Sequence, residues 1–223
     1  HTTSCGTRMV GRICGARIPV RKTDRWWQVK ERPIIFSGPM VRAILEGRKT
    51  QTRRLIKPQA NTIVGDLLGQ PKWYLDADPG RVVRCPYGVP GDRLWVRETF
   101  APLEALRTPD PGGDALRDGA FYRASYPSGL CHRDDGADLK WTPAIHMPRA
   151  LSRIDLEVTD VRAERLQSIS EEDARAEGLT PDLMTARTSF MWIWDEINGK
   201  RAPWASNPWV WVVDFKVVRG GKS

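Results

Sequence analysis

The chain has 223 residues, a formal net charge of +8 at pH 7 and a hydrophobic content of 40%. This length and composition exclude an intrinsically disordered protein and allow one large domain or two small ones. No apolar stretch approaches the roughly 18 residues of a membrane span, and the first 30 residues lack the apolar middle region of a signal peptide. We therefore expect a cytoplasmic protein with no membrane partner.

Cysteine and histidine are sparse and scattered. No CxxC spacing occurs, and the one adjacent Cys–His pair cannot by itself complete a tetrahedral site. The sequence therefore predicts no disulfide framework, no metal and no cofactor. The residues concerned are Cys5, Cys14, Cys85, Cys131, His1, His132 and His146.

The positive charge is concentrated near the start of the chain. Residues 1–60 carry 14 Lys/Arg and 3 Asp/Glu, whereas residues 61–223 carry 21 and 24. Such a patch is typical of proteins that bind RNA or a nucleotide, although a basic tail can also be merely solvated. Residues 1–31 show little periodicity, so we expect them to form a basic arm that is disordered or outside the fold.

The first predicted elements are a short strand over 33–37 and a helix over 39–46. Pro39 suits the first turn of that helix, and Gly47 suits its end. Residues 51–56 then predict a second strand. A helix-to-strand turn between these elements is a common place for functional groups.

The run GRKTQTRR at 47–54 is the most informative segment of the chain. Its density of charge predicts a surface built for an anion, such as a phosphate-bearing ligand. Lys49 and Thr52 stand three apart, which can bring an amine and a hydroxyl to one side of a turn. The remaining cations of the run, candidates for phosphate or nucleic-acid binding, are Arg48, Arg53 and Arg54.

The middle of the chain is rich in turn residues. Residues 58–90 predict loops with short strands near 72–75 and 81–85, and a partly alternating strand follows at 93–100. The segment around 101–140, rich in Pro, Gly and Asp, is expected to be a loop-rich insertion.

The last third is more regular. Alternating apolar residues predict a long strand over 152–165 with one irregularity, and a strongly β run predicts another over 209–218. Ser170 predicts the N-cap of a short acidic helix that ends at Gly178, and a second helix is predicted over 185–197. Residues 32–219 are therefore expected to form a single α+β domain, a small mixed β-barrel flanked by a few helices.

Two of the ten tryptophans stand beside loops instead of within a periodic segment. Trp95 and Trp141 are therefore candidates for stacking on a nucleobase. Most of the others, such as Trp192, Trp194, Trp209 and Trp211 in periodic segments, are expected to pack in the core or at an interface.

Three segments, taken in order, resemble the ASCH (activating-signal-cointegrator homology) domain family. They are IIFSGPMVRAILEGRKTQTRR, GDRLWVRETF and PAIHMPR, and they include the pattern GxKxxTxR at Gly47, Lys49, Thr52 and Arg54. The resemblance covers about 33–218 and is strongest to bacteriophage and prophage members, loosely labelled as phage morphogenetic proteins. It implies a PUA-like fold, a compact β-barrel with flanking helices, in a bacterial or phage-infected cell.

Characterised relatives in that family include an N4-acetylcytidine amidohydrolase and a ribonuclease, and others are thought to bind RNA. The amidohydrolase uses a Lys, a Thr three residues on and a Glu on a later helix. These positions correspond to Lys49, Thr52 and Glu177, and the acids at 171–173 compete for the last role.

The residues fit more than one chemistry. A Lys49 amine kept neutral by nearby arginines could take the Thr52 proton during attack on a carbonyl. Glu177 could then protonate the leaving nitrogen or hold Lys49 in place. The same cations could stabilise a phosphorane in RNA cleavage. The alternatives are a module that binds RNA or a modified base without chemistry, or a structural phage-assembly protein. The sequence does not choose among them.

Overall fold

The computed structural model describes residues 29–57, 59, 63–65, 73–75, 78–102, 119–125, 140–180 and 184–220. Residues 1–28 of the expected basic arm lie outside this set, as does most of the expected insertion around 101–140. Strand β1 begins at Glu31, the last residue of that arm.

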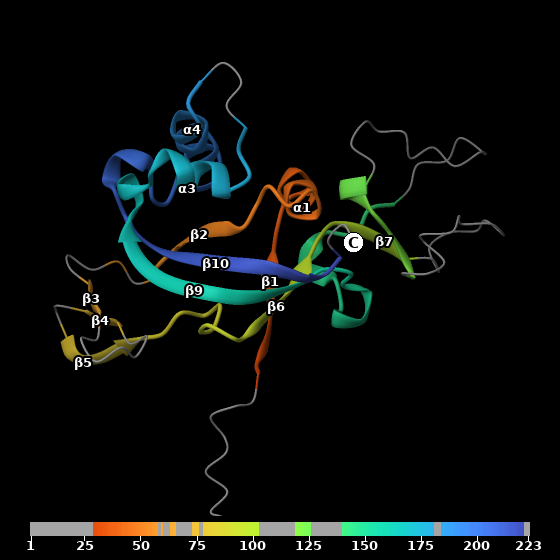
Figure 1. The fold of residues 1–223 in the computed structure, drawn as a ribbon, viewed down its shortest axis with the longest axis horizontal. Coiled ribbons are helices and arrows are strands. Elements are labelled where there is room, and N and C mark those ends of the chain that lie inside the picture. Colours follow the sequence, from red (N-terminus) through yellow and green to blue (C-terminus); the bar gives the residue numbers. More distant parts are fainter. Residues whose placement is uncertain are drawn as a thin grey trace, which may run out of the picture.

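A five-stranded sheet forms the body of the described domain (Figure 1). Its strand order is β1-β6-β9-β10-β2, with β1 parallel to β6 and the other neighbours antiparallel. The register of β9 and β10 shifts twice, between Asp214 and Phe215 and between Val217 and Arg219. The first shift leaves an extra residue in β9, where one irregularity was expected. The strands are β1 (Glu31–Ile35), β2 (Gln51–Leu55), β6 (Arg93–Arg97), β9 (Asp155–Arg165) and β10 (Trp209–Arg219).

Shorter strands form two small sheets beside this one. The first has the order β3-β4-β5, and the second pairs β7 with β8. Their bounds are β3 (Ile63–Gly65), β4 (Trp73–Leu75), β5 (Asp78–Val83), β7 (Phe100–Pro102) and β8 (Ala120–Tyr122). Single 3-10 turns lie at Arg123–Ser125, Ala144–His146, Arg149–Leu151, Leu166–Ser168 and Trp204–Ser206.

The described helices begin and end where their sequence signals predict. Helix α1 (Gly38–Leu45) has Pro in its first turn, and α3 (Glu171–Ala176) has a capping box in which Ser170 and Asp173 bond reciprocally. Helix α4 (Ala186–Asn198) is capped by the Thr185 hydroxyl. In Figure 1, α3 and α4 lie together over one end of the sheet, and α1 lies further along it.

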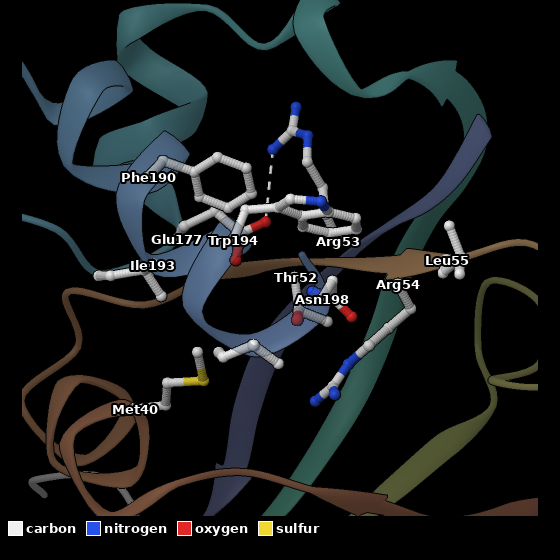
Figure 2. A pocket seen from close by; sticks show the side chains of 11 residues that line it. Met40, Thr52, Arg53, Arg54, Leu55, Glu177, Phe190, Ile193, Trp194 and Asn198 are labelled. Carbon is white, nitrogen blue, oxygen red and sulfur yellow. Dashed lines mark hydrogen bonds and ion pairs between the residues drawn. The ribbon is translucent and has the colours of Figure 1, made fainter. Parts of the chain in front are cut away.

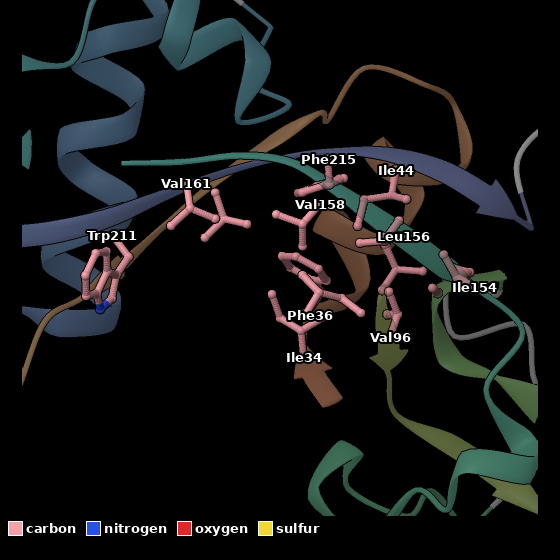
Figure 3. Packing of buried hydrophobic residues seen from close by; sticks show 14 of the residues in the cluster. Ile34, Phe36, Ile44, Val96, Ile154, Leu156, Val158, Val161, Trp211 and Phe215 are labelled. Atoms are coloured by element: carbon pink, nitrogen blue, oxygen red, sulfur yellow. The ribbon is translucent and has the colours of Figure 1, made fainter. Parts of the chain in front are cut away.

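Alternation along β10 divides the interior into two cores. Trp211, Val213 and Phe215 pack with residues of β1, β6, β9 and α1, as Figure 3 shows for part of this cluster. Val210 and Val212 point the other way, toward Phe190 and Trp194 of α4 and the buried Ala174 of α3. One strand thereby fixes both α1 and the α3–α4 pair.

The expectation of an α+β fold is confirmed. In the part of the chain that the structure describes, β1 and β2 are the two edges of the five-stranded sheet, so that sheet is open. A side chain spans the gap between these edges: Arg54 of β2 donates to the Ile35 carbonyl of β1, and its guanidinium lies 5.2 Å from the Phe36 ring centroid. None of the described helices is long and apolar enough to cross a membrane.

Candidate functional site

The basic run does not form the exposed cationic surface that its charge density predicts. The side chains of Lys49 and Arg53 are 0% exposed, whereas that of Arg48 is 41% exposed. The expectation failed because carboxylates far away in the sequence lie against the two buried cations and compensate their charge. Arg48 bonds to Glu46 at the surface and to the carbonyl of Gly178.

A tight turn brings Lys49 inward. Gly47 has a φ of 76°, a conformation that favours glycine, and the backbone N–H groups of Arg48 and Lys49 both donate to the Ala43 carbonyl. Thr50 then donates to the carbonyl of Ala176 at 2.8 Å. This pairing joins the start of β2 to the end of α3, so Glu177 lies directly beside Lys49.

Lys49 and Glu177 form a buried ion pair. The Lys49 Nζ atom lies 2.7 Å from Glu177 Oε2 and also donates to the carbonyls of Glu177 and Gln51 at 2.9 and 2.8 Å. Burial lowers the pKa of Lys49, the charge of Glu177 opposes that shift, and the nearby Arg54 and Arg53 add to it. The Lys49 amine is therefore easier to deprotonate than a solvated lysine.

Arg53 is held by carboxylates on α3 and β9. Its guanidinium bonds to Asp173 Oδ2 at 3.0 Å and lies 3.4 Å from Glu177 Oε1 and 3.6 Å from Glu164 Oε2. Gln51 accepts from Arg53 and donates to Asp173 and Asp214. Arg53 therefore positions Glu177 and Asp173, and its charge is already balanced without a phosphate.

A small pocket of about 80 Å³ brings Thr52 and Glu177 together (Figure 2). We call it the β2 pocket. Glu177 therefore contacts Lys49 and lines the same pocket as Thr52, whereas Lys49 does not line the pocket and Thr52 is not among the three acceptors of its amine. The pocket is lined by Met40, Thr52, Arg53, Arg54, Leu55, Glu177, Phe190, Ile193, Trp194, Ile197 and Asn198.

A larger cavity of about 550 Å³ shares five of these lining residues and lies between α1 and α4. We call it the α1–α4 cleft. Its charged lining residues are Glu177 and Glu196, and its walls are otherwise mostly apolar. The shared residues are Met40, Glu177, Phe190, Ile193 and Ile197.

The α4 lining was missed as a functional surface at the level of sequence. The 3.6-residue period of Phe190, Ile193, Trp194 and Ile197 indicates a core face, yet Ile197 is 62% exposed. Phe190 and Trp194 are buried as expected. The sequence period identifies the apolar face of the helix, but it cannot show that the C-terminal end of that face lines a cavity.

The two tryptophans proposed for base stacking lie elsewhere. Trp95 on β6 has the guanidinium groups of Arg97 and Arg149 at 5.4 and 5.9 Å from its ring centroid. Trp141 has that of Arg123 at 5.4 Å. Neither tryptophan lines the β2 pocket or the α1–α4 cleft.

Two of the acids that compete with Glu177, Glu171 and Asp173, have other contacts. Glu171 accepts from the N–H groups of Ala186 and Arg187 at the start of α4, which together lower its pKa. Asp173 belongs to the Arg53 network. Within the described residues, no group of three or more His, Cys, Asp or Glu side chains is placed to hold a metal ion.

Comparisons with protein-family models, with curated proteins and with solved structures found no match to this chain.

Proposed function

We propose that this chain is a hydrolase that removes an acyl group from a modified nucleoside of the N4-acetylcytidine type. One observation supports the proposal above the others: Glu177, held at 2.7 Å by the buried Lys49, lines the same pocket as Thr52. An acid–base pair beside a hydroxyl is the minimum set for nucleophilic acyl transfer.

The chemistry balances around one shared proton. The mechanism requires that the proton shared by the pair lie on Glu177 when Thr52 attacks, which leaves the Lys49 amine neutral. Thr52 Oγ1 attacks the acyl carbon and passes its proton to Lys49, while Glu177 gives its proton to the departing exocyclic nitrogen. Water then cleaves the acyl–Thr52 ester: Glu177 takes a proton from the water, and Lys49 returns one to the Thr52 oxygen.

The cleft favours a nucleoside over a stretch of RNA. Its charged lining residues are carboxylates, and the two buried cations nearby are already paired. A phosphate backbone would meet repulsion there, whereas a neutral base with an apolar acyl group would match the walls. Among the cations of the β2 pocket, Arg54 is the best candidate to contact a phosphate; it also donates to the Ile35 carbonyl.

We also propose that the fold is the PUA-like fold of ASCH domains. The curvature that brings β1 and β2 within reach of the Arg54 side chain supports a barrel that is closed by side chains on this side. The same resemblance to ASCH domains leads us to propose a phage or prophage protein that acts in the cytoplasm.

A non-catalytic binding module is the second candidate, and a specific observation favours it. All three donor positions of a charged Lys49 amine are occupied, and none of them meets Thr52. In that case the pair would be structural, and the cavity would bind a modified base without changing it.

The test is mass-spectrometric turnover of N4-acetylcytidine and a panel of acylated nucleosides, run beside cleavage of labelled RNA. The variants are Thr52→Val, which keeps the shape but removes the hydroxyl, and Thr52→Ser, which keeps the hydroxyl. The proposal predicts that Thr52→Val loses at least 100-fold in kcat/KM and that Thr52→Ser retains most of it. Binding without turnover by the wild-type chain, unchanged in Thr52→Val, would establish the binding module instead.

A further inference from the structure

Strand β2 presents one edge to the β2 pocket. Four consecutive residues, 52–55, line that pocket. Successive side chains of a strand point to opposite faces, so a cavity lined by four consecutive residues must lie along the edge of the strand. Its opposite edge pairs with β10.

The hydrogen-bond pattern shows which backbone groups face the pocket side. Phe215 N–H donates to the Thr50 carbonyl at 2.8 Å, and Ile56 N–H donates to the Trp209 carbonyl at 3.1 Å. With the antiparallel register, these bonds turn the N–H and C=O groups of Thr52 and Arg54 toward β10.

The backbone groups of the alternate residues therefore point away from β10. Gln51 fits this pattern, because its carbonyl accepts from Lys49 Nζ on the free side. The next two such residues are Arg53 and Leu55. Within the described part of the chain, no hydrogen bond reaches the N–H or C=O of either residue on that side.

Side chains limit what can occupy this edge. Trp194, Ile197 and Asn198 from the end of α4 line the same pocket, as Figure 2 shows for Trp194 and Asn198. A volume of about 80 Å³ accepts a planar fragment but not an added peptide strand. The Thr52 hydroxyl and the Asn198 carboxamide add polar groups to the wall.

We propose that the free backbone N–H groups of Arg53 and Leu55 recognise the acyl carbonyl of the bound nucleoside. The N–H and the C=O of an acylated exocyclic amine point to opposite sides of the planar amide, so the strand edge bonds to one of them. A backbone N–H that donates to the acyl oxygen is a contact that an unacylated base cannot make. This inference rests on the proposed function. It assigns to the free edge of β2 the discrimination between a base that carries an amide and a base that carries none.

Proline at position 55 tests the contact directly. Leu55→Pro removes an N–H that makes no bond to β10, a substitution that edge strands tolerate, and Leu55→Ala controls for the lost side chain. We expect Leu55→Pro to bind N4-acetylcytidine about fivefold to tenfold more weakly than Leu55→Ala, which is the effect of one hydrogen bond.

A second readout does not depend on whether Leu55→Pro folds. In the ¹⁵N-labelled Thr52→Val chain, added N4-acetylcytidine should shift the Arg53 and Leu55 amides and slow their hydrogen exchange. The amides of residues 52 and 54, which already bond to β10, should change less.

The outcomes separate this inference from the proposed function. Turnover by the wild-type chain with unshifted Arg53 and Leu55 amides, and equal binding by the two Leu55 variants, would overturn only the backbone contact. Failure of the wild-type chain both to bind and to hydrolyse any nucleoside in the panel would overturn the proposed function and this inference with it. Protection of the Arg53 and Leu55 amides by an extended peptide, and not by a nucleoside, would also overturn this inference.

Discussion

Removing Glu177 should destabilise the fold more than removing Lys49. Glu177→Ala leaves the Lys49 ammonium, whose side chain is 0% exposed, with carbonyl partners but without its counter-charge. Breaking a buried pair in this way typically costs about 3–5 kcal/mol. Lys49→Met leaves Glu177 beside Arg53 at 3.4 Å, so its cost should be about 1–3 kcal/mol.

The assay is urea unfolding at pH 7, followed by tryptophan fluorescence. The double variant Lys49→Met/Glu177→Ala should lose less than the sum of the two single variants, because neither charge is then left alone. Equal losses in the two single variants, or a strictly additive double variant, would refute the reasoning that the pair is held by mutual charge compensation.

The pH dependence of stability provides a check on the same pair. Because burial lowers the folded-state pKa of Lys49 below its ordinary value of 10.5, the unfolded chain binds more protons between the two values. The Lys49 contribution to stability should therefore rise with pH through that window and be absent from Lys49→Met. A slope that is identical in wild type and Lys49→Met would show that Lys49 is not its source.

Three further predictions concern the surroundings of the site. Gly178→Ala should lower the thermal stability of the fold more than Gly47→Ala. Both glycines have positive φ, but an added Cβ at 178 would lie 2.8 Å from the Ala43 Cβ, whereas at 47 it meets nothing within 4 Å. Equal losses of stability would exclude a steric effect. Burial raises the pKa of the Cys85 thiol to about 11, so with the other cysteines replaced its alkylation at pH 8 should be at least tenfold slower than that of a cysteine peptide, and a comparable rate would show that the thiol is accessible and ionised. Burial alone would raise the pKa of Asp173, but the charge of Arg53, the hydrogen bond from Gln51 and other partners outweigh it, so the net pKa is below 3.8. Asp173 therefore stabilises the fold above pH 3.8, and this stabilisation is lost as the pH falls through its folded-state pKa. Acid unfolding of Asp173→Asn should lack this pH-dependent component.

Local signals predicted most of the secondary structure. Ser170 as N-cap, Gly178 as the stop after α3, Pro39 in the first turn of α1 and the alternation of β9 each follow from the chemistry of a few adjacent residues. These features depend on neighbours in the sequence, which is why they can be predicted without a structure. The open form of the five-stranded sheet depends on pairing between distant strands and could not be predicted.

The site shows the same division. The spacing of Lys49 and Thr52 indicated a candidate site. Glu177 was assigned through the resemblance to ASCH domains, which implies a Glu on the later helix. The burial of Arg53 could not be predicted, because its partners Asp173 and Glu164 reach it only through the packing of α3 and β9. The α4 wall was missed since a helix face beside a cavity has the same period as one in a core.

The dual packing of β10 has a consequence for how the chain acquires its structure. Strand β2, with the site at its start, has β10 as its neighbour in the sheet, and β10 is synthesised after all the other described helices and strands. Contacts of such long sequence separation form slowly. During synthesis the final positions of Lys49, Thr52 and Glu177 should therefore be among the last features to form, and both cores should remain incomplete until that strand docks.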